Sequence, residues 1–188
     1  MSFIACADLP FPNLPTHLID EVIRISYSMS AISIFRDTPT ASGRFCLRNT
    51  SNTLLEWARE NVSDQIKIVW VQTIKDGNFG PHIDGPGKTS GSRRYFNLMY
   101  ILNTGGEKVL THFYDPLKAD IGDQTVFKYE EVLLKETFEF KANTWNMMNN
   151  QEIHSVEGVT GNRVCLSLSF YNPELPKMFE NLILAQEV

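Results

Sequence analysis

Residues 163–171 read Arg-Val-Cys-Leu-Ser-Leu-Ser-Phe-Tyr, and this stretch shows most clearly how the chain folds. Successive side chains of a β-strand leave opposite faces of the sheet. One face would carry apolar side chains: Val164, Leu166, Leu168 and Phe170. The other would carry small, partly polar side chains beside one cation: Arg163, Cys165, Ser167 and Ser169. The apolar face predicts packing against a core, and the opposite face leaves room for a ligand in the mouth of a barrel.

Further short strands precede this one. Their β-branched and aromatic residues, bounded by Gly and Asn turns, predict strands over 66–74, 95–102, 108–114, 125–129, 136–141 and 152–156. A short Gly-containing turn joins 152–156 to 163–171, so we expect these two strands to pair as an antiparallel hairpin. The strands over 95–102 and 108–114 are joined in the same manner through Asn-Thr-Gly-Gly at 103–106.

Helices are expected at both ends of the chain. Leu18–Ile23 predicts a helix that extends towards Phe35, with Thr16 as its N-cap behind Pro15. A second helix is expected over 54–59, capped by Ser51 or Asn52, and a third over 178–184. Helices followed by short strands predict a mainly β fold, a double-stranded β-helix (jelly roll) with N-terminal helices packed on one sheet.

The composition fits one domain spanning residues 1–188. We expect a helical support over 1–64, a jelly-roll catalytic core over 65–172 and a C-terminal helix over 173–188. The net charge of −5 argues against a general nucleic-acid or membrane binder. The sequence contains no run of about 18 apolar residues, so we expect no membrane-spanning helix. Three widely spaced cysteines, Cys6, Cys46 and Cys165, indicate reduced thiols in a cytoplasmic protein.

Four residues indicate the chemistry. His82 and Asp84 are two positions apart, so on a strand their side chains leave the same face. With His154 they would form two His and one carboxylate, a facial triad that leaves half of an octahedral Fe(II) open to small molecules and O₂. Arg163 offers a planar, always-charged fork suited to a carboxylate. The set predicts an iron oxygenase with an acidic co-substrate.

Other roles for these residue types stay open at this point. Arg163 would instead form a structural ion pair if Glu152 or Glu157 lay beside it. His112, within the strand over 108–114, is an alternative pocket residue or a replacement for one ligand of the triad. His17 lies at a helix start, where we expect it to be exposed.

The order of motifs resembles that of a known superfamily. His82–Asp84 is followed by Arg94, by Tyr-Ile-Leu-Asn at 100–103, by Gly-Gly-Glu at 105–107, by Thr-His-Phe at 111–113, and by Ile-His-Ser-Val at 153–156 with Arg163. Over about residues 66–171 this order resembles the Fe(II)/2-oxoglutarate dioxygenases, most closely the prolyl-hydroxylase-like branch. Two positions depart from it. The usual Arg-x-Ser reads Arg-Val-Cys at 163–165, and the usual Gly-Gly-Glu-Thr ends in Lys108, so a prolyl target is not implied.

The resemblance implies that His82, Asp84 and His154 bind iron and that Arg163 pairs with the distal carboxylate of 2-oxoglutarate, with a further hydrogen bond from Thr111. The cofactors would be Fe(II), 2-oxoglutarate and O₂. The implied reaction is hydroxylation of a C–H bond in an amino acid, a peptide side chain or a small metabolite, with release of succinate and CO₂. Because Asp84 is present, hydroxylation is favoured over halogenation.

The segment at 85–94 is rich in Gly and carries three basic residues. We expect it to close over the site, where Lys88 and Arg93 would meet an acidic group of the substrate; the alternative is a solvated surface turn. Asn97 and Tyr114 are further candidate substrate residues.

Two other classes of protein fit parts of the pattern. One is a cupin-like metal enzyme that does not use 2-oxoglutarate, and the other is a non-catalytic jelly-roll binding module. For the oxygenase, the expected partner is a small-molecule or peptide substrate with an acidic group. No membrane partner is expected, and the net charge disfavours a nucleic acid. The pattern does not predict an oligomeric state.

Overall fold

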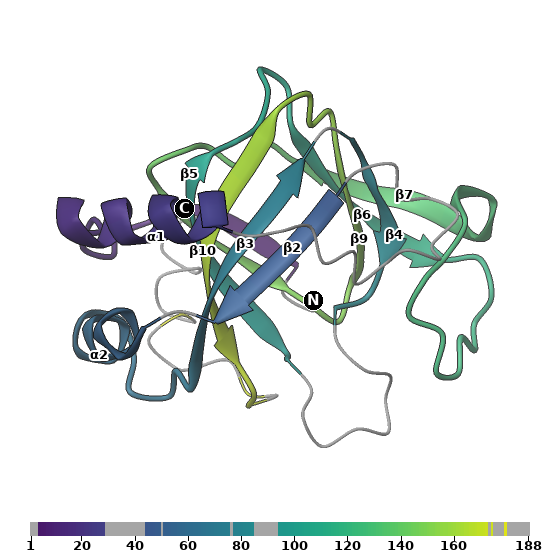
Figure 1. The fold of residues 1–188 in the computed structure, drawn as a ribbon. Coiled ribbons are helices and arrows are strands. Elements are labelled where there is room, and N and C mark those ends of the chain that lie inside the picture. The colour runs from purple at the N-terminus through teal and green to yellow at the C-terminus, as the bar shows by residue number, and fades with distance from the viewer. Residues whose placement is uncertain are drawn as a thin grey trace.

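The computed structural model describes residues 4–28, 44–49, 51–75, 77–84, 94–172, 174 and 179, with the backbone alone for 44–49. Two antiparallel sheets make up most of this part of the chain (Figure 1). The larger sheet contains, in spatial order, β1 (Ala5–Leu9), β8 (Trp145–Asn149), β5 (Phe96–Asn103), β10 (Asn162–Phe170), β3 (Ile68–Lys75) and β2 (Arg44–Asn49). The smaller contains β4 (Phe79–His82), β9 (Ile153–Glu157), β6 (Leu110–Pro116) and β7 (Val132–Phe138).

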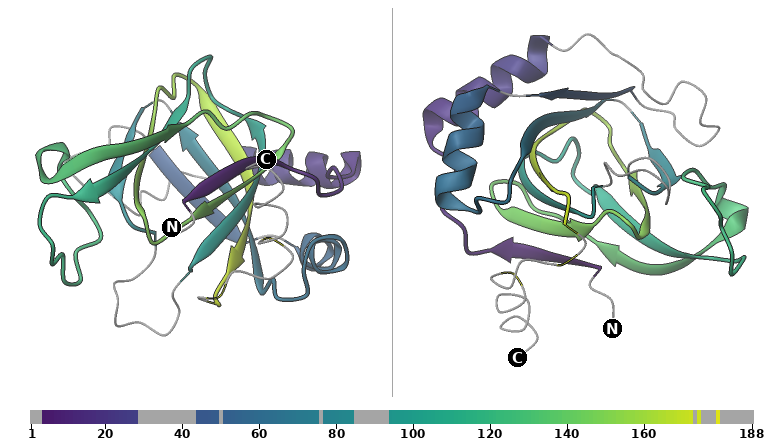
Figure 2. Two further views of the ribbon diagram at one scale, coloured as in Figure 1. Left: turned by 180° about the vertical axis from the view of Figure 1, so that it is seen from behind. Right: turned by 90° about the horizontal axis from the view of Figure 1, so that it is seen from below.

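The two sheets face each other around a common interior, which the view from below shows end-on (Figure 2). Consecutive strands cross between them: β3 leads to β4, β5 to β6 and β9 to β10, each step changing sheet. This is the double-stranded β-helix that the sequence predicts.

The same crossings correct the expected hairpins. β9 pairs with β4 and β6, whereas β10 pairs with β3 and β5, so the strands that carry His154 and Arg163 are not hydrogen-bonded to each other. β5 and β6 likewise lie in different sheets. A short connection usually joins paired strands. Here residues 158–161 step from one sheet to the other, with Gly158 in the left-handed region at φ +79°.

Several strands differ from those expected. The segment 1–64 holds β1 and β2 as well as helices, so it adds two strands to the larger sheet. β8 was not predicted, because its Asn and Met residues have little strand preference. Residues 125–129 form an isolated bridge and the start of a 3-10 helix (Tyr129–Glu131) instead of a strand, and β7 lies a few residues before the expected range.

Two helices, α1 (Thr16–Ser28) and α2 (Asn52–Asn61), lie against the outer face of the larger sheet (Figures 1 and 2). The Ser51 side chain accepts a hydrogen bond from the backbone N–H of Leu54, as expected of an N-cap. Thr16 is already the first residue of α1. The expected extension of α1 towards Phe35 and the helix expected over 178–184 lie outside the described residues.

Packing explains why the faces of β10 differ. Val164, Leu166, Leu168 and Phe170 belong to the main core between the sheet and the helices. Cys165 belongs instead to a smaller cluster with Phe113, between the two sheets. The apolar face therefore anchors the helices, and the other face borders the interior, as its alternation predicts.

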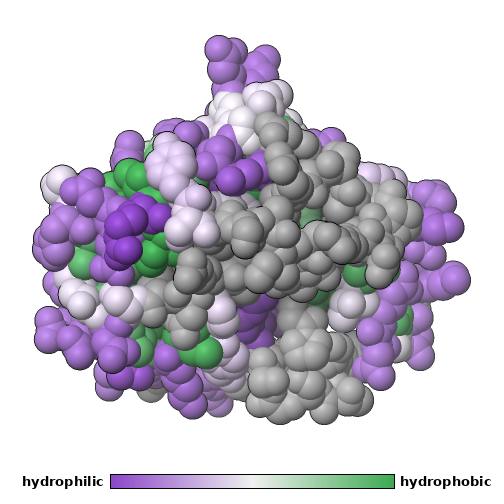
Figure 3. Space-filling view, in the orientation of Figure 1, coloured by the Kyte–Doolittle hydropathy of each residue, from purple (hydrophilic) through white to green (hydrophobic). Residues whose placement is uncertain are grey.

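The visible surface agrees with this division. Described residues on the face of Figure 3 are mainly hydrophilic, with apolar patches beside the helices. Among the described residues, no helix is both long and apolar enough to cross a lipid bilayer.

Candidate metal and co-substrate site

His82 and His154 stand opposite each other on paired strands. His82 ends β4, and its Cα partner on β9 is His154. Asp84 follows two residues later, and the candidate ligand atoms of the three side chains all lie within 4.8 Å of one another. The register between β4 and β9 thus gathers residues that are some 70 positions apart in sequence.

Backbone carbonyls fix the orientation of both imidazoles. Nδ1 of His82 lies 2.8 Å from the carbonyl oxygen of Gly80, and Nδ1 of His154 lies 2.9 Å from that of Glu152. A carbonyl oxygen only accepts hydrogen bonds, so each Nδ1 is protonated and is the donor. The lone pair of each Nε2 is then directed at a ligand. Burial lowers the pKa of His154 to about 4, so its ring is neutral at pH 7.

Asp84 is held from two sides. Its Oδ1 lies 3.4 Å from Nε2 of His82, and its Oδ2 lies 3.6 Å from Nη2 of Arg94. Burial alone would raise the pKa of Asp84, but the Arg94 guanidinium holds it well below its ordinary value. The backbone N–H of Asp84 donates to the carbonyl of Asn150. The carboxylate is therefore ionised and fixed.

The strand that carries His82 is supported on its other edge by residues 125–127. Val126 forms a β-bridge with His82. The N–H of Ile83 donates to Thr125, and that of Phe127 donates to Pro81. His82 is thus held between β9 and this segment of the β6–β7 connection.

A hollow of about 510 Å³, open to solvent, extends from these three side chains into the space between the sheets. Arg163, Thr111 and Asn97 also line it, so the structure brings these predicted site residues together with the metal candidates.

Arg163 is only 4% exposed. Among the described residues, no carboxylate forms an ion pair with it. Glu152 pairs with Lys135, and Glu157 accepts hydrogen bonds from hydroxyl groups on the far side of the sheet, so the alternative of a structural ion pair does not hold. Burial lowers the pKa of Arg163. Oγ1 of Thr111, which lines the same hollow, is buried and has no hydrogen-bond partner among the described residues.

Of the remaining candidate substrate residues, one is described by the structure and two are not. Asn97 is buried, and its Oδ1 accepts a hydrogen bond of 3.0 Å from Ser169. Lys88 and Arg93 lie outside the described residues, so their expected role stays a prediction.

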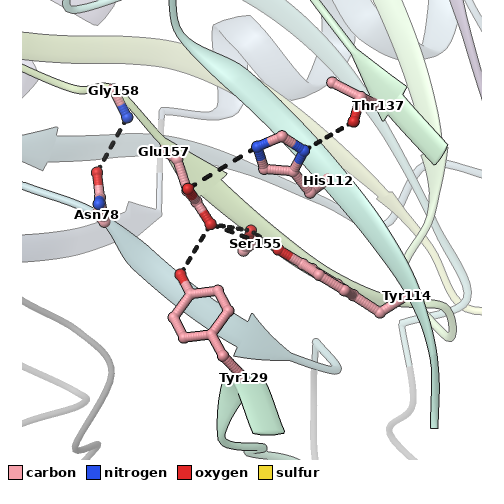
Figure 4. A network of polar contacts seen from close by, with 8 residues as sticks. All are labelled: Asn78, His112, Tyr114, Tyr129, Thr137, Ser155, Glu157 and Gly158. Atoms are coloured by element: carbon pink, nitrogen blue, oxygen red, sulfur yellow. Dashed lines mark hydrogen bonds and ion pairs between the residues drawn. The ribbon is translucent and has the colours of Figure 1, made fainter. Parts of the chain in front are cut away.

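Tyr114 and His112 lie on the opposite face of the smaller sheet (Figure 4). The Tyr114 hydroxyl is 2.9 Å from Oγ of Ser155, and Nδ1 of His112 is 2.8 Å from Oγ1 of Thr137. Neither residue is among the described residues that line the hollow. The structure therefore places Tyr114 and His112 away from the described lining of the hollow, and His112 outside the cluster of His82, Asp84 and His154. Thr111 faces inward on β6, so His112 and Tyr114, which are one and three positions further along the strand, face outward.

Three polar residues near the site, Gln72, Arg94 and Asn150, were given no individual role from the sequence. Gln72 lines the hollow from β3. A Gln within a strand of Val and Ile was a usable signal, because β-branched runs rarely include an amide without a partner for it. Arg94 and Asn150 reach Asp84 through tertiary contacts that no sequence spacing reveals.

No family model matches the chain, and a search of curated proteins found no match. Solved structures do match. Two structures of the α-ketoglutarate-dependent epimerase SnoN of nogalamycin biosynthesis have TM-scores of 0.53 and 0.55, each at 13% identity. The matches cover 85% of this chain and 76% and 74% of theirs. A prolyl hydroxylase from Trichoplax adhaerens has a TM-score of 0.51 at 12% identity, over 89% of this chain and 82% of that one. At this identity the likeness establishes the fold alone: the chain has the jelly-roll fold of these solved structures.

Proposed function

We propose that this protein is an Fe(II)/2-oxoglutarate-dependent oxygenase. One observation carries the proposal: a cluster of two His and one Asp shares a hollow with a buried Arg that has no carboxylate partner among the described residues. Either feature alone has structural explanations. Together they provide a site for a metal and a site for a dicarboxylate within one cavity.

The donor set fits iron. His82, His154 and Asp84 supply two imidazoles and one ionised carboxylate, the ligands typical of non-haem Fe(II) oxygenases with open coordination positions. The carbonyls of Gly80 and Glu152 hold the imidazoles in the tautomer that a metal requires.

Arg163 and Thr111 fit the co-substrate. A buried guanidinium without an anion is costly, and so is a buried hydroxyl without a partner. A carboxylate bound between them satisfies both groups. We assign this role to the distal carboxylate of 2-oxoglutarate, whose keto-acid end would then face the three metal ligands.

When bound, Fe(II), 2-oxoglutarate and O₂ supply the oxidation of a substrate C–H bond, with release of succinate and CO₂. The protein's own part is to position the ligands and to line the hollow with apolar side chains such as Phe79 and Met148. We propose hydroxylation of an amino acid, a peptide side chain or a small metabolite.

The type of substrate is consistent with the matched structures. SnoN was solved with nogalamycin RO, and the prolyl hydroxylase with a peptide fragment. We propose that the substrate carries an acidic group that meets Lys88 and Arg93, and that Asn97 contributes a hydrogen bond from the wall of the hollow.

The proposal is tested by iron content and by thermal stabilisation with 2-oxoglutarate. Wild type should bind one Fe(II) and gain in Tm on addition of 2-oxoglutarate under anaerobic conditions. Arg163→Ala should keep the iron and lose the gain. The matched control is Arg24→Ala, the same change at an exposed position of α1.

Two outcomes would reject the proposal in favour of its alternatives. Iron binding with no effect of 2-oxoglutarate in wild type supports a cupin-like metal enzyme. No stoichiometric iron at all supports a binding module.

A further inference from the structure

Two amide side chains line the hollow, and each is held by the residue directly opposite on β10. Gln72 on β3 is the Cα partner of Cys165, whose Sγ donates to Gln72 Oε1 at 3.3 Å. Asn97 on β5 is the Cα partner of Ser169, whose Oγ donates to Asn97 Oδ1 at 3.0 Å. In both pairs the amide oxygen is engaged by the neighbouring strand.

An engaged amide oxygen determines where the NH₂ group points. The amide is planar, so with Oε1 of Gln72 directed at β10 its Nε2 is directed away from Cys165. Nε2 donates no hydrogen bond to any of the described residues, and Gln72 borders the hollow. Burial raises the pKa of the Cys165 thiol to about 11, so the thiol keeps its proton and remains the donor.

The register places Gln72 near the cationic end of the hollow. Arg163 is the Cα partner of Ile74, and Cys165 is the partner of Gln72. Gln72 is thus a diagonal neighbour of Arg163, a relationship that brings long side chains within reach of a common ligand. Both residues line the same hollow.

We propose that Gln72, oriented by Cys165, donates a hydrogen bond from Nε2 to the carboxylate that Arg163 binds. This inference rests on the proposed function and extends it by one binding residue. The residue two positions after the arginine is a cysteine whose hydrogen is committed to Gln72, so the donor next to Arg163 is an amide on the adjacent strand.

The test is the dissociation constant of 2-oxoglutarate from the Fe(II)-loaded protein, titrated calorimetrically without oxygen. Gln72→Leu should weaken binding about 10-fold, the usual effect of losing a hydrogen bond to a charged group. Gln72→Glu, nearly isosteric, should weaken it further, because a carboxylate would face the ligand's carboxylate. Cys165→Ala should weaken it less than either, because the amide keeps its donor and loses only its orientation. Iron content should be unchanged in all three.

A second ligand separates a direct contact from a structural effect. 2-Oxobutyrate has the keto-acid group and lacks the distal carboxylate, so its affinity should be the same in wild type and Gln72→Leu. Gln65→Leu, the same change at an exposed position, is the control for both ligands.

The inference is overturned if Gln72→Leu and Gln72→Glu bind 2-oxoglutarate like wild type, or if both ligands weaken equally. If Gln72→Leu does not fold, Gln72→Glu decides. Failure of the proposed function looks different: wild type itself would then bind iron and no 2-oxoglutarate, or Arg163→Ala would bind it normally.

Discussion

Gly105 lies directly against Arg163: a Cβ on Gly105 would stand 2.7 Å from the backbone nitrogen of Arg163. Gly105 has φ +83°, and its carbonyl accepts hydrogen bonds from the N–H groups of Thr160 and Gly161. The connection between β5 and β6 therefore packs against the connection between β9 and β10. This contact fixes the point at which β10 begins, and with it the position of the guanidinium in the hollow.

Gly105→Ala should weaken both the fold and co-substrate binding. The added methyl group meets backbone, which moves less readily than a side chain, and the residue keeps an unfavourable φ. We expect a loss of about 1–3 kcal/mol in the free energy of unfolding and a weaker affinity for 2-oxoglutarate. Chemical denaturation and anaerobic titration measure the two effects.

Gly122→Ala is the control for backbone strain alone. Gly122 has φ +53°, and a Cβ there would meet no atom of the described residues within 4 Å. Its replacement should cost about 1 kcal/mol in the free energy of unfolding and leave the affinity for 2-oxoglutarate unchanged. Equal losses of affinity in the two variants would show that the contact with Arg163 is not what matters.

Arg94 should determine how firmly iron is held. It is the cation beside Oδ2 of Asp84, so it orients the carboxylate and keeps it ionised. Removal of such a partner of a metal ligand typically costs about 10- to 100-fold in metal affinity. Arg94→Ala should therefore raise the Fe(II) dissociation constant by about 10-fold, and Arg94→Lys by less. Competition with a chelator measures this, and an unchanged dissociation constant in Arg94→Ala would show that Asp84 needs no such support.

The two faces of the smaller sheet should respond differently to loss of a histidine. His154→Ala removes a candidate ligand and should abolish stoichiometric iron binding. His112→Ala removes the ring that bonds Thr137 on the outer face, and should retain full iron content. Metal analysis of the purified variants separates these results. Loss of iron in His112→Ala would contradict the assigned ligand set.

The buried thiols should react slowly at neutral pH. Burial raises the pKa of Cys6 and of Cys165 to about 11, from an ordinary value of 9.0. The reactive thiolate is therefore scarce at pH 8 in the folded protein. Because the folded pKa is raised, the stability that these thiols contribute is present below about pH 9 and is lost as the pH rises through about 11. Mass spectrometry after iodoacetamide treatment should find both residues unmodified at pH 8; rapid modification of either in the folded protein would contradict their burial.

Much of the site follows from local pattern. The spacing of His82 and Asp84, and the alternation along β10, place side chains on a face whatever the partner strand is. Local pattern does not determine which strands pair. Residues 158–161 could turn back into a hairpin or cross to the other sheet, and the choice depends on tertiary packing around Gly105 and Gly158. The contact of Arg94 with Asp84 is likewise a tertiary contact. Strand pairing and this contact were therefore beyond the reach of spacing and propensity, whereas the outward position of Tyr114 follows from alternation once Thr111 faces inward.

The central claim is that one cavity binds Fe(II) through His82, Asp84 and His154 and 2-oxoglutarate through Arg163. Chelation of Fe(II) by the keto-acid produces a weak visible charge-transfer band, which reports both ligands at once. The most direct measurement is this band under anaerobic conditions in wild type and in Arg163→Ala. The account predicts a band in wild type that weakens strongly in the variant at equal 2-oxoglutarate. Iron-loaded wild type with no band at high 2-oxoglutarate would contradict it.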